Sequence, residues 1–335
     1  MSTRVAINGF GRIGRNFIRA MIDRNADLEV VAINDLGDLE TLAHLLRYDT
    51  VYGKPGFPVE VKGADSLEIN GNAVKIFSER SPSDLPWADL DVDVVIESTG
   101  VFRSREKAAM HIEAGANRVI ISAPSGDCDA TFVIGVNDEY YDPATDVVIS
   151  NASCTTNCLA ALVKVLDDNW GIESGMITTV HAYTGDQSIV DGPHKDLRRA
   201  RAAAVNIIPT STGAAKAIGL VLPHLDGKLD GFAARVPVVD GSLTDFVAKV
   251  NGTPSVEEVN AAFKDAADSG KLAPVLDYSE EPLVSSDIVG SPASCIFDSG
   301  LTMTMGDTVK IAGWYDNEWG YSNRLLDLSE RVSKA

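Results

Sequence analysis

The sequence predicts an α/β protein whose first half forms a parallel sheet covered by helices and whose second half forms an α+β layer. Two observations carry this prediction. From residue 4 to about residue 150, short apolar runs alternate with amphipathic stretches, a pattern typical of parallel strands joined by crossover helices. After Gly171, apolar runs follow one another with fewer helices between them, which is typical of an α+β layer.

The first elements predict a Rossmann dinucleotide-binding domain. A strand over residues 4–8 leads into Gly9-Phe10-Gly11-Arg12-Ile13-Gly14 and then into an amphipathic helix. Glycines at these positions let the backbone approach a pyrophosphate at the helix N-terminus. A second strand, 28–34, ends at Asp35, which lies 21 residues after Gly14. This is close to the ~20 residues expected for an acid that binds the ribose.

Asp35 has more than one interpretation: it is a ribose ligand, or else a helix cap or a turn residue. As a ribose ligand, its carboxylate favours NAD and repels the 2′-phosphate of NADP. Leu36 follows it and places no basic side chain beside it. Further strands are expected at 92–97, 118–121, 132–136 and 147–149, with a helix over 105–114. Thr99 and Ser122 directly follow two of these strands, where ligands bind in open α/β sheets.

The segment Ser150–Cys158 predicts a strand, a turn and a helix, with Asn151 or Ser153 as the helix cap. Cys154 then falls in the first helical turn, where the helix dipole favours a thiolate. The β-branched run 177–180 predicts the next strand, and His181 stands where it gives way to loop residues. The two side chains could meet as nucleophile and base. The alternatives are a small buried thiol and a core histidine.

Composition limits the class of protein. The chain has 335 residues, 45% of them hydrophobic, a length that suits two domains. The net charge of −19 argues against nucleic acid or an anionic membrane as the main partner. Four unpatterned cysteines and the lack of an apolar span indicate a reduced, cytoplasmic protein, and no metal site is expected.

Several motifs together resemble the glyceraldehyde-3-phosphate dehydrogenases. Ala152-Ser153-Cys154-Thr155-Thr156-Asn157-Cys158 is similar to the active-site signature of that family. The resemblance runs from residue 5 to about 328 and includes 8–15, 97–102, 181–187, 193–203, 209–216 and 314–322. It implies oxidation and phosphorylation of D-glyceraldehyde 3-phosphate, with NAD and inorganic phosphate, to 1,3-bisphosphoglycerate and NADH. Cys154 would carry a thioester and His181 would move protons.

The resemblance also assigns the remaining site residues. For the cofactor it implies Gly9, Gly11, Arg12, Ile13, Gly14, Asp35, Arg80, Thr99, Ser122 and Asn317. For the phosphate of the substrate it implies Thr184, Asp186 and Arg235, with Asp186 orienting Arg235, and for the attacking phosphate Ser153, Thr155, Arg199, Thr212 and Gly213. It further implies a homotetramer, an NAD-binding domain over 1–151 on which the C-terminal helix 318–335 packs, and a catalytic domain over 152–317.

Three other functions are compatible with parts of this pattern. Erythrose-4-phosphate dehydrogenases share the Ser-Cys-Thr-Thr-Asn motif, although segment 209–216 is closer to the triose enzymes. The Cys154 and His181 pair alone would also suit a hydrolase or acyltransferase, which needs no nicotinamide. A nucleotide-binding regulatory protein without catalysis is the third alternative, and the intact set of Cys154, His181, Arg199 and Arg235 argues against it.

Overall fold

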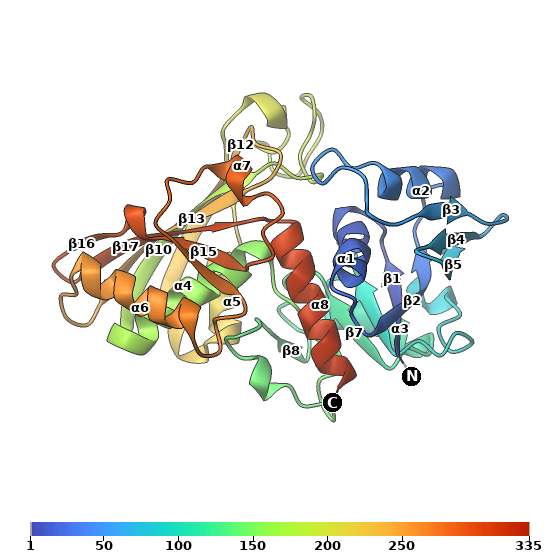
Figure 1. Cartoon of the computed structure of the whole chain (residues 1–335), viewed down its shortest axis with the longest axis horizontal. Coiled ribbons are helices and arrows are strands. Elements are labelled where there is room, and N and C mark those ends of the chain that lie inside the picture. The colour runs from blue at the N-terminus through green and yellow to red at the C-terminus, as the bar shows by residue number, and fades with distance from the viewer. Residues whose placement is uncertain (1, 335) are drawn as a thin grey trace. The chain divides into compact units, whose positions relative to one another are not determined.

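The computed structural model describes residues 2–334, and their contacts divide the chain into two compact units. The first unit comprises residues 2–132, 139–152 and 322–334, and the second comprises 133–138 and 153–321. Figure 1 follows the chain by colour from blue at the N-terminus to red at the C-terminus. Residue 1, the first of the expected domain 1–151, and residue 335, the last of the expected helix 318–335, lie outside the described residues. Within residues 2–334, no helix is both long and apolar enough to span a membrane.

The first unit is built on a nine-stranded sheet with the order β3-β4-β5-β2-β1-β6-β7-β9-β8. All neighbours from β5 to β8 pair in parallel. The strands are β1 (Thr3–Asn8), β2 (Leu28–Asn34), β3 (Val59–Val61), β4 (Ser66–Ile69), β5 (Asn72–Phe77), β6 (Val94–Glu97), β7 (Arg118–Ile121), β8 (Ala130–Thr131) and β9 (Val148–Ser150), and the helices are α1 (Arg12–Asp23), α2 (Leu39–Arg47) and α3 (Arg105–Glu113).

The strand order of this sheet places its ligand site. β1 lies between β2 and β6, so the chain leaves β1 toward one edge of the sheet and later returns to its other side. Ligands bind at the carboxyl ends of strands where the order reverses in this way. The predicted Rossmann-type domain is confirmed, and its cofactor site is expected at the ends of β1, β2 and β6.

Local sequence explains the ends of several elements. Asp38 accepts a hydrogen bond from the Thr41 N–H at the start of α2, and Ser104 accepts one from Lys107 N–H at the start of α3. The turn between β4 and β5 has positive φ at both Asn70 and Gly71. A type I′ hairpin turn requires this conformation, which Asn and Gly adopt at low cost.

The strand expected over 132–136 is wrong. β8 ends at Thr131, and the residues after it form turns. Asn137 accepts a hydrogen bond from the Val133 N–H, and Asp138 accepts one from Gly135 N–H, whose residue has φ +83°. Side chains therefore take up the backbone donors that a strand would have offered to a neighbour.

The second unit contains a mixed sheet with the order β11-β12-β10-β13-β17-β15-β14, and β16 pairs with β17. This antiparallel-rich sheet confirms the predicted α+β layer. Its strands are β10 (Ile172–Ala182), β11 (Ile208–Ser211), β12 (Leu229–Val236), β13 (Ser242–Val250), β14 (Leu276–Ser279), β15 (Cys295–Asp298), β16 (Met303–Met305) and β17 (Thr308–Tyr315), and its helices are α4 (Cys154–Trp170), α5 (Ala214–Val221), α6 (Val256–Asp268) and α7 (Ser285–Ile288).

Two helices connect the fold to its site. α4 carries Leu159, Leu162 and Leu166 fully buried, which fixes the helix that begins at Cys154. Cys158 is also fully buried, with its Sγ 3.3 Å from Cys295 Sγ, in keeping with a packing role. The C-terminal helix α8 (Trp319–Ser333) belongs to the first unit from residue 322 onward, where Asp327 forms a 2.7 Å ion pair with Arg24.

Candidate active site

The glycine-rich turn after β1 forms a cradle for a pyrophosphate. Gly9 has φ +96°, and a Cβ at this position would lie 2.6 Å from Thr99 N. A Cβ on Gly14 would lie 2.5 Å from Gly9 O, so α1 can pack against the turn only through a glycine. A Cβ on Gly11 would meet nothing within 4 Å, and Gly11 caps α1 without a side chain. α1 thus begins beside the turn at a residue without a side chain, and a helix start of this kind can bind an anion.

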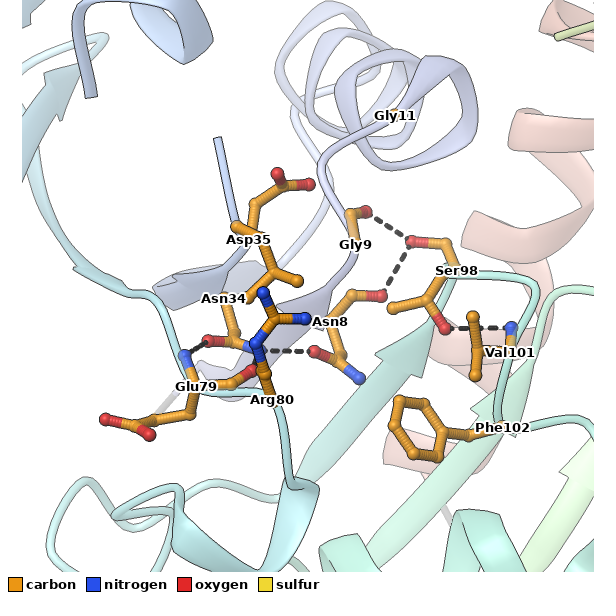
Figure 2. A pocket seen from close by; sticks show the side chains of 12 residues that line it. Asn8, Gly9, Gly11, Asn34, Asp35, Glu79, Arg80, Ser98, Val101 and Phe102 are labelled. Carbon is orange, nitrogen blue, oxygen red and sulfur yellow. Dashed lines mark hydrogen bonds between the residues drawn. The ribbon is translucent and has the colours of Figure 1, made fainter. Parts of the chain in front are cut away.

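A cavity of about 450 Å³ opens beside this turn, a size within the range of ~300–1,000 Å³ typical of ligand sites. Five of the cofactor residues expected from sequence line it, namely Gly9, Gly11, Asp35, Arg80 and Thr99. Figure 2 shows Asp35, Arg80 and Phe102 around the opening. Seven further residues line the cavity but were not expected as cofactor residues from the sequence: Asn8, Asn34, Leu36, Glu79, Ser98, Val101 and Phe102. Asn8 and Asn34 end strands β1 and β2, a position that could have identified them.

The remaining cofactor residues lie outside this lining. The Arg12 side chain forms an ion pair with Asp49, with 3.2 Å between Nη2 and Oδ1. Ser122 follows β7 and its N–H donates to Glu97 O. Ile13 and Gly14 stand in the first turn of α1. Asn317 belongs to the second unit.

Asp35 is held by the backbone at the end of β2. Its Oδ2 accepts from Phe10 N–H at 2.7 Å and its Oδ1 accepts from Gly37 N–H at 2.8 Å. Each carboxylate oxygen keeps lone pairs for a ribose hydroxyl. No basic residue follows Asp35 in the sequence. In the fold, however, the basic side chain of Arg80 lines the same cavity as Asp35.

Cys154 and His181 meet in the second unit. Cys154 is the first residue of α4, and Ser153 caps the helix by accepting from Thr156 N–H at 3.0 Å. His181 is the last residue but one of β10. Cys154 Sγ lies 3.5 Å from His181 Nε2, within reach of a proton transfer. The predicted cap and the predicted pairing of thiol and imidazole are both present.

Hydrogen bonds select the tautomer of His181. Nδ1 lies 2.7 Å from Ala182 O, which can only accept, so Nδ1 carries the proton. Arg235 Nη1 lies 3.0 Å from the same nitrogen but finds acceptors in Ala182 O at 3.1 Å and Thr184 Oγ1 at 3.3 Å. With Nδ1 protonated, the lone pair of Nε2 faces the Cys154 thiol. The imidazole is oriented as a base toward sulfur.

Burial favours the neutral forms of both groups. It raises the pKa of the Cys154 thiol to about 11, against the opposing effect of the nearby Arg235 charge. Burial, with the Arg235 charge acting in the same direction, lowers the pKa of His181 to about 3. Burial therefore opposes the thiolate expected at the helix start, while the Arg235 charge favours it.

Two arginines carry the positive charge of the second unit's site. Arg235, at the end of β12, contacts Ala182 O and Thr184 Oγ1. Arg199 donates to Thr210 Oγ1 at 2.9 Å and to Ser211 O at 3.2 Å, and it forms an ion pair with Asp186. Asp186, on the long loop after β10, forms its ion pair with Arg199, and its charge also acts on Arg235, so its role in orienting Arg235 stays a prediction.

The hydroxyl residues assigned to the attacking phosphate differ in their surroundings. Thr155 is buried, and its Oγ1 lies 2.8 Å from the Tyr315 hydroxyl, which also contacts Thr179 Oγ1 at 2.8 Å. Gly213 stands at the N-cap of α5, as expected, and the Thr212 hydroxyl accepts from Ala214 N–H at 3.2 Å. Tyr315 was not expected at the site. A single tyrosine in an apolar strand gives no sign in the sequence that it has a functional role.

Asn317 is oriented through Ser242, a second residue missed from sequence. Ser242 Oγ accepts from Ala182 N–H at 3.1 Å, so its own hydrogen is donated to Asn317 Oδ1 at 2.7 Å. This assigns the carbonyl end of the Asn317 amide to Ser242. The amide NH₂ is then the group that Asn317 presents to a ligand.

A glycine cradle at a Rossmann switch point and an oriented cysteine–histidine pair define a class of protein, the nicotinamide-dependent dehydrogenases that use a cysteine nucleophile. Family comparisons agree. Residues 3–105 match the family described as glyceraldehyde 3-phosphate dehydrogenase, NAD binding domain, and residues 153–317 match its C-terminal domain.

Known proteins match over essentially the whole chain. Glyceraldehyde-3-phosphate dehydrogenase 2 of Streptomyces avermitilis is 61% identical over 330 residues, which are 98% of each chain. The enzyme named glyceraldehyde-3-phosphate dehydrogenase from Streptomyces coelicolor is 61% identical over 331 residues, again 98% of each chain. That of Mycobacterium tuberculosis is 58% identical over 340 residues and 100% of each chain. The chain belongs to the glyceraldehyde-3-phosphate dehydrogenase family, and NAD is its cofactor.

Proposed function

We propose that this chain oxidises and phosphorylates D-glyceraldehyde 3-phosphate, with NAD and inorganic phosphate, to 1,3-bisphosphoglycerate and NADH. The observation that carries the proposal is the Cys154 Sγ to His181 Nε2 distance of 3.5 Å, in a tautomer that makes Nε2 the base. A glycolytic or gluconeogenic role follows from this reaction. The domains we infer are an NAD-binding domain over 1–151 with the helix 318–335, and a catalytic domain over 152–317.

Cys154 and His181 divide the chemistry between them. As sulfur adds to the aldehyde carbon, His181 Nε2 takes the thiol proton and returns it to the new alkoxide, which gives a hemithioacetal. Nε2 then takes the hydroxyl proton as hydride leaves the carbon. Bound NAD supplies the hydride acceptor. Phosphate attacks the resulting thioester, and the departing Cys154 sulfur regains its proton from His181.

The charged groups fit two anion sites. We infer that Arg235 and Thr184 bind the substrate's phosphate, where the Arg235 guanidinium offers forked donors, and that Asp186 orients the arginines of this site. For the attacking phosphate we infer Ser153, Thr155, Arg199, Thr212 and Gly213. The start of α5 at Gly213 supports the second site, because the first backbone N–H groups of a helix can bind an anion. The Cys154 N–H and protonated His181 would stabilise the developing oxyanion.

The cofactor residues we infer include five that line the cavity beside the glycine turn and five that do not line it. A Cβ on Gly9 or Gly14 would overlap neighbouring backbone, so these glycines permit the tight turn, and the open space for a pyrophosphate lies at Gly11, where a Cβ would meet nothing within 4 Å. Asp35 would hold the ribose, Arg80 the adenine side and Asn317 the carboxamide of the nicotinamide. The full set is Gly9, Gly11, Arg12, Ile13, Gly14, Asp35, Arg80, Thr99, Ser122 and Asn317.

Initial rates test the reaction directly. Purified protein with D-glyceraldehyde 3-phosphate and NAD should form NADH, followed by absorbance, and the rate should depend on inorganic phosphate. D-erythrose 4-phosphate as the better substrate would favour the erythrose-4-phosphate dehydrogenase alternative. Turnover of acyl substrates without nicotinamide would favour the acyltransferase or hydrolase. A rate independent of phosphate would contradict the anion site around Arg199.

Asp35→Ser is expected to relax the preference for NAD. It removes the charge that repels a 2′-phosphate, while Arg80 in the same cavity remains to attract one. We expect kcat/KM for NAD to fall by ~10–100-fold, as for loss of charged hydrogen bonds, and the NADP-to-NAD ratio to rise. Asp38→Ser is the matched control, since it removes the same charge but keeps a helix cap. An unchanged ratio in Asp35→Ser would contradict the ribose assignment.

We also infer a homotetramer. Large apolar side chains are exposed on the loop after β10, with Ile189 87% and Leu197 82% exposed. Others lie exposed on the sheet strands, at Met176, Phe232, Met303 and Met305. Apolar surface of this kind favours burial against further copies of the chain. Sedimentation should give a mass roughly four times the 35.7 kDa of the chain, and a monomer at micromolar concentration would contradict the inference.

We infer a cytoplasmic location from the cysteines of the chain. All four cysteines are free thiols, which suits a reducing compartment. Fractionation of the source cells, followed by the NADH assay, tests this location.

A further inference from the structure

A chain of buried polar side chains lies beneath the cofactor cavity, and the proposed reaction does not use it. Trp87, His111 and Glu97 are at most 2% exposed, and Asn8 and Asn34 are at most 5% exposed. Burying so many polar groups costs free energy unless each is hydrogen-bonded. All five belong to the first unit, so the chain of contacts lies within one compact body.

Donor and acceptor roles in this chain follow from its first member. The Trp87 indole can only donate, and its Nε1 lies 3.0 Å from His111 Nδ1. His111 Nδ1 must therefore accept, and the ring proton is on Nε2. Nε2 then donates to Glu97 Oε2 at 3.1 Å. The indole sets the tautomer of His111 and aims its N–H at the carboxylate.

Glu97 is the acceptor on which the donors converge. Its Oε2 accepts from Asn8 Nδ2 at 2.6 Å as well as from His111. Its Oε1 accepts from Thr99 N–H at 2.9 Å and from the Thr99 hydroxyl. The two oxygens of the Glu97 side chain therefore hold the Asn8, His111 and Thr99 groups in one network of hydrogen bonds.

The carboxylate controls both walls of the cavity. On one wall, Asn8 gives its NH₂ to Glu97 and therefore offers Oδ1 to Asn34 Nδ2 at 2.7 Å. Asn34 Oδ1 in turn accepts from Glu79 N–H at 2.8 Å, as Figure 2 shows. On the other wall, the Thr99 hydroxyl donates to Glu97 and accepts from Val101 N–H at 3.1 Å.

We propose that Glu97 is a positioning residue for NAD, with His111 and Trp87 fixing its direction and Asn8, Asn34 and Thr99 carrying its effect to the cavity. The proposal rests on NAD binding in this cavity. Glu97 would not touch the reacting atoms. Its loss should therefore weaken cofactor binding while leaving the chemistry of the Cys154 and His181 pair intact.

Glu97→Gln tests the proposal in the full-length protein. The variant keeps the size of the side chain but turns an NH₂ toward donors. Calorimetric titration should show a Kd for NAD at least ~10-fold higher, with KM for NAD raised equally and kcat at saturating NAD within ~3-fold of the parent. If Glu97 served only folding, the variant would have a lower melting temperature, but KM for NAD would not rise while kcat stayed the same. A folded Glu97→Gln protein whose Kd lies within twofold of the parent would overturn the proposal.

Two variants of His111 keep the test decisive if Glu97→Gln fails to fold. His111→Gln can still accept from Trp87 and donate to Glu97, whereas His111→Leu can do neither. We expect His111→Leu to bind NAD several-fold more weakly and His111→Gln to retain most of the affinity. Equal Kd values for the two would overturn the proposal. Because binding is measured without turnover, a failure here is distinguishable from failure of the proposed reaction.

Discussion

Replacing Cys154 by alanine should lower the phosphate-dependent rate of NADH formation by at least ~10⁴-fold, as loss of a covalent nucleophile does in other enzymes. The sulfur that carries the thioester is gone, and no second thiol can replace it, because Cys158 is fully buried against Cys295. The affinity for NAD should stay within about twofold, since the glycine cradle belongs to the other unit. Stopped-flow absorbance and calorimetric titration measure the two quantities.

Cys128→Ala is the matched control for this change. It removes a partly buried thiol of the first unit, where Cys128 Sγ contacts the backbone at Ala130 O, 3.2 Å away. We expect its rate to equal that of the parent protein. Loss of both NAD binding and activity in Cys154→Ala would show instead that Cys154 maintains the structure. Residual phosphate-dependent turnover above about one-hundredth of the parent rate would point to a different nucleophile.

Much of the fold could be predicted because local signals coincide with the structure. The run 28–34 was expected as a strand and is β2, and the expected helix over 105–114 is α3 (Arg105–Glu113). Asn70 and Gly71, a residue pair typical of hairpin turns, join β4 to β5. The segment after Thr131 failed because side-chain acceptors at Asn137 and Asp138 are not visible in a hydrophobic pattern.

The site was predictable in its residue types and less so in its pairings. Cys154 and His181 carry local signals, since one follows a strand and the other ends one. The contact of Asp186 with Arg199 depends on how a long loop folds, which spacing does not determine. The high pKa of the Cys154 thiol depends on burial by residues far along the chain. The contacts of Glu97 likewise join β1, β6 and α3, which only the assembled sheet brings together.

Replacing His181 by glutamine should reduce kcat by ~10²–10⁴-fold, the usual contribution of a positioned acid–base group. Glutamine can fill the space and donate to Ala182 O, as Nδ1 does now, but it cannot take the Cys154 proton. KM for NAD should change little. His224→Gln is the matched control, because the exposed His224 pairs with Asp167, with its Nε2 2.6 Å from Asp167 Oδ2, and makes no contact with Cys154 among the described residues. Equal losses in both variants would contradict a base role for His181.

The same variant isolates the effect of the buried imidazole on stability. Burial lowers the pKa of His181 to about 3, from an ordinary value near 6.5. At any pH between these two values, the unfolded chain binds a proton on this imidazole that the folded chain does not. The stability contributed by the neutral imidazole is therefore complete above pH ~6.5 and is lost as pH falls, by ~2 kcal/mol at pH 5. His181→Gln lacks this term, so its free energy of unfolding in urea should fall less between pH 7 and pH 5 than that of the parent. Parallel pH profiles would mean that the imidazole reaches solvent and titrates normally. The chemistry would then start from a charged histidine at mildly acid pH rather than from the neutral base that the Ala182 contact holds.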